Sequence, residues 1–208
     1  MTLEQDLRIS ERMTRIILQG MQEILGGAGL ATIGDLIDNP HLGEDTLLSQ
    51  PLEGLRFSEV SSIQQAFEEL YGEQGARGAA LRSGRSAFCY FLKEFGDEAG
   101  FNQLEFRLTP LKRRVLAGLE SLARIISREI GQQIQVQTSG KVWTWQINNC
   151  PECWGRQSLT PACHFTVGLL QEFLSWLSGG KVYLVEEIAC RAEGNPACSI
   201  RIDQTPLD

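Results

Sequence analysis

Five of the six cysteines in this 208-residue chain lie between residues 150 and 198. Thiolate sulfur is a preferred ligand of zinc, and four such ligands form a closed tetrahedral site of the structural kind. The clustering therefore predicts a zinc site in the C-terminal part of the chain. The sixth cysteine, Cys89, lies alone in an apolar stretch, and we interpret it as a buried thiol that packs like a small hydrophobic side chain. The clustered cysteines are Cys150, Cys153, Cys163, Cys190 and Cys198.

One candidate ligand set combines three of these thiols with a carboxylate. Cys163 precedes a predicted helix, Cys190 ends a predicted strand, and Cys198 begins the strand that pairs with it. Glu187 lies three residues before Cys190, and residues three apart face opposite sides of an ideal strand. Glu187 can therefore share a metal with Cys190 only if the strand bends or ends near Ile188.

A second feature is the Cys-Pro-Glu-Cys sequence at residues 150–153, which is a moderate signal for metal binding. Cys150 and Cys153 could complete the same zinc site or bind a metal separately. A redox role is the rival, but no thioredoxin-like βαβ pattern surrounds the pair. Two further interpretations are an iron–sulfur cluster on four of the five cysteines and a disulfide between Cys190 and Cys198.

Composition and charge narrow the function classes. A formal charge of −7 and a pI near 5.0 argue against a nucleic-acid-binding surface. No run of 18 apolar residues predicts a membrane span, and the charged N-terminal residues lack the apolar segment of a signal peptide. We therefore expect a cytoplasmic protein, in which cysteines are more often thiols or metal ligands than disulfides.

The elements that must position these residues are helical before residue 131 and largely extended after it. Gly78 and Gly84 fall inside one of the predicted helices, which indicates that close packing or a ligand needs the space there. Glycines at 26, 72 and 75 are expected to end helices. Amphipathic periodicity and capping residues predict helices at residues 3–26, 58–71, 76–95 and 109–130, with an irregular surface segment at 30–56.

The C-terminal part alternates between apolar and polar residues in the manner of strands. A hairpin is predicted at 133–147, a helix at 164–176, and two further strands at 181–189 and 198–202. Because the helices come first and the strands pair late, the fold class is α+β, with helices packed on a small antiparallel sheet.

Several segments together resemble the 4-vinyl reductase domain family. The resemblance is specific over about residues 105–203 and extends more loosely through residues 82–85. Related domains are the sensors of phenol- and xylene-responsive bacterial regulators and the TRAPP transport-complex subunits. The segments that carry it are Cys150-Pro-Glu-Cys153-Trp-Gly, Pro161-Ala-Cys163-His164-Phe165, Gly168-Leu-Leu-Gln-Glu and Glu187-x2-Cys190-Arg-Ala-Glu-Gly194-Asn-x2-Cys198.

The resemblance implies a TRAPP-subunit-like ligand-binding fold that is often dimeric and contains an apolar pocket. It divides the chain into an N-terminal helical extension, residues 1–75, and a 4-vinyl reductase-like domain, residues 76–208. Carried over from the phenol sensors, the zinc ligands are Cys163, Glu187, Cys190 and Cys198, with Cys150 and Cys153 as further candidates.

An apolar cavity is expected where the helix at 76–95, the strand carrying Trp143 and Trp145, and the helix after Cys163 meet beside the zinc loop. Each aromatic side chain could equally be ordinary core, and each arginine part of a solvated helix face. Candidate lining residues are Phe88, Phe91, Trp143, Trp145, Phe165, Trp176 and Tyr183, with His164, Arg82 and Arg85 as candidate polar groups.

Three functions fit this interpretation. The favoured one is a zinc-stabilised binding or carrier protein, often a homodimer, for a hydrophobic small molecule such as an aromatic hydrocarbon or a tetrapyrrole intermediate. The second is a reductase in bacteriochlorophyll synthesis, and the third is an assembly subunit. No G-x-G-x-x-G fingerprint follows a predicted strand, and a closed zinc site leaves no open position, so binding is favoured over catalysis.

Overall fold

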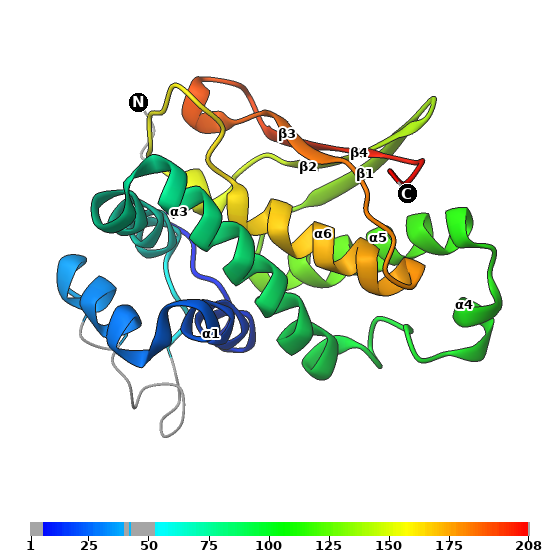
Figure 1. The fold of residues 1–208 in the computed structure, drawn as a ribbon, viewed down its shortest axis with the longest axis horizontal. Coiled ribbons are helices and arrows are strands. Elements are labelled where there is room, and N and C mark those ends of the chain that lie inside the picture. Colours follow the sequence, from blue (N-terminus) through cyan, green and yellow to red (C-terminus); the bar gives the residue numbers. More distant parts are fainter. Residues whose placement is uncertain (1–5, 40–41, 43–52, 208) are drawn as a thin grey trace.

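Helices lie on one side of a small sheet in the computed structural model of this chain, which describes residues 6–39, 42 and 53–207 (Figure 1). Short 3-10 turns occupy Pro151–Cys153 and Arg191–Glu193. The helices are α1 (Glu11–Leu36), α3 (Phe57–Phe95), α4 (Leu104–Leu108), α5 (Leu111–Ile130) and α6 (His164–Ser178), and the strands are β1 (Ile134–Ser139), β2 (Val142–Ile147), β3 (Val185–Ala189) and β4 (Cys198–Asp203).

The four strands form one antiparallel sheet in the order β1-β2-β4-β3. Alternate residues of β2 and β4 are buried, so one face of these strands packs against the rest of the protein. The predicted α+β class is confirmed, as are the hairpin at 133–147 and the late pairing of the two C-terminal strands. Trp143 and Trp145 share the buried face of β2, as their spacing predicted.

Helix α1 is displaced from its predicted range. It begins at Glu11 because the hydroxyl of Ser10 accepts a hydrogen bond from the backbone N–H of Met13 at 3.1 Å. The predicted stop at Gly26 appears as a break with φ of 71°, after which the helix resumes to Leu36. Residues 3–5 of the predicted helix, and 40–41 and 43–52 of the predicted surface segment, lie outside the described residues.

Helix α1 is long and apolar enough to pass a membrane-span test by length and composition alone. This is weak evidence, because the core helix of a soluble domain passes the same test. The break at Gly26 divides α1 into two segments that are each too short to cross a bilayer. Its side chains at Met13, Ile17 and Met21 are buried in the protein core.

Helix α3 joins the two helices predicted at 58–71 and 76–95. The predicted break appears as a kink at Gly72, where φ is 68°. The helix begins at Phe57, since the carboxylate of Glu59 accepts from the backbone N–H of Arg56 at 2.6 Å. Cys89, predicted to be buried, is exposed, because the aromatic stripe of α3 turns the opposite face inward.

Helices α3 and α6 cross at two glycines. A Cβ atom added to Gly84 would lie 2.0 Å from the carbonyl oxygen of Phe165, and one added to Gly168 would lie 2.0 Å from that of Leu81. Neither position can hold a larger residue unless the helices separate. The prediction that an internal glycine of this helix permits close packing is confirmed at Gly84, and this crossing fixes the position of α6.

Candidate metal centre and adjoining cavity

Five cysteines converge where α6 and the sheet meet. Cys150 and Cys153 flank the turn after β2, and Cys163 occupies the N-cap position of α6. Cys190 follows β3, and Cys198 is the first residue of β4. All five side chains are buried. The structure thus brings together every cysteine of the predicted cluster.

The sulfur atoms are spaced as ligands of one metal ion would be. Zinc–sulfur bonds of about 2.3 Å in a tetrahedral site place the sulfurs about 3.8 Å apart. The Sγ atom of Cys163 lies 3.5 Å from that of Cys198 and 3.9 Å from that of Cys190, and Cys190 and Cys198 are 4.0 Å apart. The arrangement therefore fits a tetrahedral ion without rearrangement of the loops.

Two overlapping sets of four side chains could hold the ion. One set is Cys150, Cys153, Cys163 and Cys198, and the other replaces the first two with Glu187 and Cys190; the ligand atoms of each set lie within 4.8 Å of one another. Cys163 and Cys198 belong to both sets. The remaining members distinguish the two sites, both structurally and experimentally.

Glu187 favours the second set. The pairing of β3 with β4 is irregular between Glu187 and Ala189, which removes the parity obstacle, and Ile188 points to solvent. One carboxylate oxygen accepts from the backbone N–H of Cys163 at 2.8 Å, whereas Oε1 is buried without a partner. Burial, and then the nearby Cys190, raise the pKa of Glu187 to about 9. A cation at Oε1 would satisfy this atom and hold the carboxylate ionised.

The thiols also suit a cation. Hydrogen bonds with Cys150 and Cys163 lower the pKa of Cys153, and hydrogen bonds with Cys150 and Cys153 raise the pKa of Cys163. Negative charge is therefore unevenly distributed over the cluster when no ion balances it. A divalent ion would favour the thiolate form of several cysteines at once.

Glu152 is a structural residue that sequence patterns did not single out. Its buried carboxylate accepts from the backbone N–H groups of Phe165 at 2.9 Å and Thr166 at 3.0 Å, and from the Thr166 hydroxyl. It thereby caps α6 from outside the helix and holds the Cys150–Cys153 loop against it. Capping rules search within a few residues of a helix, and Glu152 precedes α6 by too many positions to be found in this way.

An apolar cavity of about 60 Å³ adjoins the Cys150 loop. Its walls come from α1, the first half of α3, the end of α5, the sheet and α6. The predicted position beside the cysteine loop is therefore occupied by a cavity, although the half of α3 at 76–95 does not line it. The lining residues are Ile9, Met13, Ile17, Met21, Val60, Gln64, Ile126, Ile130, Ile134, Trp145, Ile147, Cys150, Pro151, Glu152, Phe165, Thr166 and Leu169.

Two of the candidate aromatic residues, Trp145 and Phe165, line this cavity. Trp143 is as deeply buried as Trp145 but lies outside the lining. The two tryptophans share a strand face, so the cavity is confined to one end of β2. Contact with the cavity therefore separates two residues that strand periodicity treats alike.

The remaining aromatic candidates pack elsewhere in the protein. Phe88 lies edge-on to Phe173, with ring centroids 5.8 Å apart, and Phe91 packs against Phe95. Both are therefore ordinary core residues. Tyr183 and the partly exposed Trp176 also lie outside the lining.

The candidate polar groups lie away from the cavity as well. Arg82 and Arg85 are exposed, and Arg85 donates to the amide oxygen of Gln171. His164 begins α6, where burial and then Arg77 lower its pKa to about 4, so its imidazole is neutral at physiological pH. A polar group that does line the cavity is Gln64, for which helical periodicity offered no functional signal.

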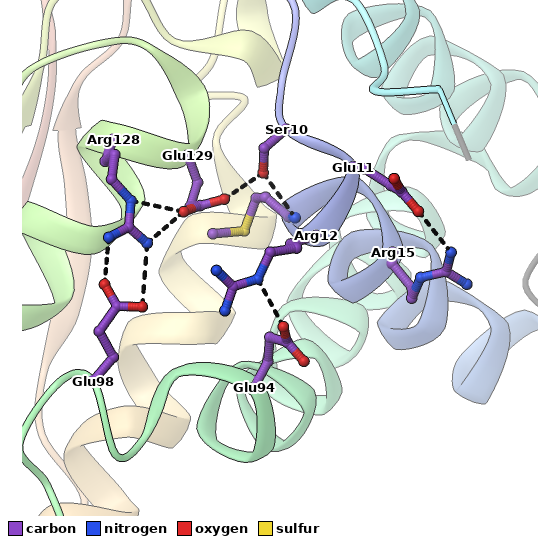
Figure 2. Close-up of polar contacts among 9 residues, drawn as sticks. Ser10, Glu11, Arg12, Arg15, Glu94, Glu98, Arg128 and Glu129 are labelled. Carbon is purple, nitrogen blue, oxygen red and sulfur yellow. Dashed lines mark hydrogen bonds and ion pairs between the residues drawn. The ribbon is translucent and has the colours of Figure 1, made fainter. Parts of the chain in front are cut away.

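A polar network fixes the wall formed by α1 and α5 (Figure 2). The Ser10 hydroxyl donates to the Glu129 carboxylate, which also pairs with Arg128 at 2.5 Å. Arg128 reaches Glu98 beyond the end of α3 as well. Since Ile9 and Ile130 flank Ser10 and Glu129 in sequence and line the cavity, this network holds two of its walls together.

Comparison with known proteins assigns the cysteine-bearing part of the chain. Residues 143–204 match the model of the 4-vinyl reductase domain. This range contains all five clustered cysteines, Glu187 and most of β2, so the predicted resemblance is confirmed here. Comparison with curated proteins gives no match.

Solved structures extend the similarity at the level of the fold. A Tt H-NOX variant has a TM-score of 0.60 at 14% identity, covering 96% of this chain and 97% of that one. An S. oneidensis H-NOX in the Fe(II)NO state has 0.59 at 12%, covering 94% and 99%. The phenol-responsive sensory domain of the activator PoxR, with phenol, has 0.52 at 17%, covering 74% and 79%. The H-NOX similarity includes the helices before residue 76.

Proposed function

We propose that this protein is a zinc-stabilised binding or sensing protein for a small hydrophobic molecule. The observation that carries the proposal is the apolar cavity built directly against the cysteine cluster, with Cys150 belonging to both. Pockets of this kind, apolar with few polar groups, are typical of small-molecule sites. The zinc would act as a rigid corner of the cavity and not as a catalyst.

Zinc is supported by the ligand chemistry of the cluster. Three thiols and the unpartnered oxygen of Glu187 form a set of the type that binds structural zinc. We propose Cys163, Glu187, Cys190 and Cys198 as the ligands. Cys150 and Cys153 then lie within hydrogen-bonding distance of two of them, at 3.4 Å from Cys163 and 3.3 Å from Cys198. Their S–H groups would help to stabilise the bound thiolates.

The cavity size favours a small ligand over a tetrapyrrole. An engineered apolar cavity of about 150 Å³ binds benzene, and pockets for drug-sized ligands measure about 300–1,000 Å³. The cavity of about 60 Å³ is smaller than both. Met13 and Met21 line it, and their flexible side chains can rearrange to admit a single ring. A ligand no larger than one ring is therefore our proposal.

The comparisons support the same class of function. The 4-vinyl reductase domain covers the metal side of the cavity, and a similar fold is found in a sensory domain solved with phenol. H-NOX structures with this fold are associated with heme. We propose a soluble, cytoplasmic protein that forms a homodimer, with no nucleic-acid partner; static light scattering would give the oligomeric state.

Tryptophan fluorescence tests the cavity directly, because Trp145 lines it and Trp143 does not. Titration with toluene should quench the fluorescence of the parent protein and raise its melting temperature, since a ligand that binds only the folded state stabilises it. Trp145→Phe should lose most of the quenching, whereas Trp143→Phe on the same strand face should retain it.

Equal loss of quenching in both variants would contradict the proposal, because it would place the ligand elsewhere or indicate general disturbance of β2. Absence of any thermal shift in zinc-loaded parent protein at saturating toluene would contradict it too. Circular dichroism of both variants provides the check that they remain folded.

A further inference from the structure

Gln64 has no hydrogen-bond partner for its amide nitrogen, although the side chain is only 4% exposed. It lies in the first half of α3 and lines the apolar cavity. Leaving a buried amide donor unsatisfied costs about 1–3 kcal/mol. A residue that carries such a cost inside a cavity is a candidate for recognition of whatever enters it.

The other polar side chains of the lining are already engaged. Both carboxylate oxygens of Glu152 accept hydrogen bonds from the start of α6, and the Thr166 hydroxyl donates to one of them. The sulfur of Cys150 lies 3.4 Å from that of Cys163. Among the described residues that line the cavity, Gln64 is therefore the one whose side chain has an unpartnered buried donor.

A trapped water molecule would be a poor partner for this amide. Buried waters are held by about three hydrogen bonds, and the lining offers side-chain groups that are otherwise apolar or already bonded. A ligand oxygen can accept from Gln64 while its hydrocarbon part contacts Trp145 and the isoleucine and methionine side chains around it. The ligand then displaces a weakly held water at little cost.

We infer that Gln64 is the polar recognition residue of the cavity, and that the ligand is a single-ring hydrophobic molecule bearing one hydrogen-bond-accepting oxygen. This inference rests on the proposed function and refines its ligand class. It also excludes cationic ligands, because the amide nitrogen donates and no free carboxylate faces the cavity among the described lining residues.

The test compares benzaldehyde with toluene, which have similar ring sizes but differ in the acceptor oxygen. Both are titrated against zinc-loaded parent protein and the Gln64→Met variant, which keeps the side-chain length and removes the donor. Benzaldehyde should bind the variant about fivefold more weakly or worse, while toluene binds it at least as tightly as the parent, since one net hydrogen bond is lost for the first ligand alone.

The ligand-free variant supplies a second readout. Because the amide nitrogen is unsatisfied in the free protein, Gln64→Met should raise the melting temperature. A fall in melting temperature, or equal weakening of both ligands, would overturn the inference and show a structural role for Gln64. Unchanged benzaldehyde affinity would overturn it while leaving the proposed function intact. Failure of the parent to bind either probe would overturn both.

Discussion

Cys198→Ser is expected to abolish zinc binding and to unfold the sheet and the start of α6. Cys198 belongs to both possible ligand sets and lies at the first position of β4, which pairs with both β2 and β3. Structural zinc contributes folding free energy on the order of 10 kcal/mol in small peptides, more than a domain of this size can lose. Elemental analysis and circular dichroism would measure the two effects.

Cys89→Ser is the matched control, because Cys89 is exposed on α3 and lies outside both ligand sets. It should keep about one zinc per chain. Cys190→Ser and Cys153→Ser then separate the two sets: the first should lose the metal and the second should retain it. A protein that contains iron and sulfide, or that folds without any metal, would contradict the zinc assignment.

Gly84→Ala should destabilise the protein by about 2 kcal/mol or more, which corresponds to a fall in melting temperature of about 4–8 °C. The added Cβ would lie 2.0 Å from the Phe165 carbonyl oxygen and 2.9 Å from the Leu169 nitrogen. Both are backbone atoms of α6, so relief requires the helices to move apart. Because Phe165 and Leu169 also line the cavity, ligand affinity should fall with stability.

Gly78→Ala is the comparison within the same helix. An added Cβ there meets the flexible end of Arg82 at 3.4 Å, so the substitution should be neutral or stabilise the helix by up to about 1 kcal/mol. Thermal denaturation of both variants measures the difference. Equal effects at the two positions would show that the crossing of α3 and α6 is not tight.

The metal ligands could be anticipated because cysteine spacing carries chemical information that does not depend on exact element boundaries. The prediction placed Cys163 before a helix and Cys190 and Cys198 on paired strands, and the structure shows these positions. The irregularity beside Glu187 could be stated only as a condition, since strand periodicity does not reveal where pairing shifts. The overlap between two ligand sets required three-dimensional distances.

The cavity was harder to predict, since periodicity shows that a side chain is buried but not whether it packs against another or faces a void. Trp143 and Trp145 are indistinguishable by this criterion, yet they differ in contact with the cavity. Gln64 has the pattern of an ordinary polar position on its helix. The contribution of α1 to the walls was not predicted either, because it depends on the long-range contact of Ser10 with Glu129.

A crystal structure of the zinc-containing protein soaked with toluene would test the central claim most directly. The account predicts an anomalous zinc signal among Cys163, Glu187, Cys190 and Cys198, and ring density in the cavity beside Trp145. A ring found instead in the surface cleft beside Trp176, or a cavity filled by the Met13 and Met21 side chains at saturating toluene, would contradict it.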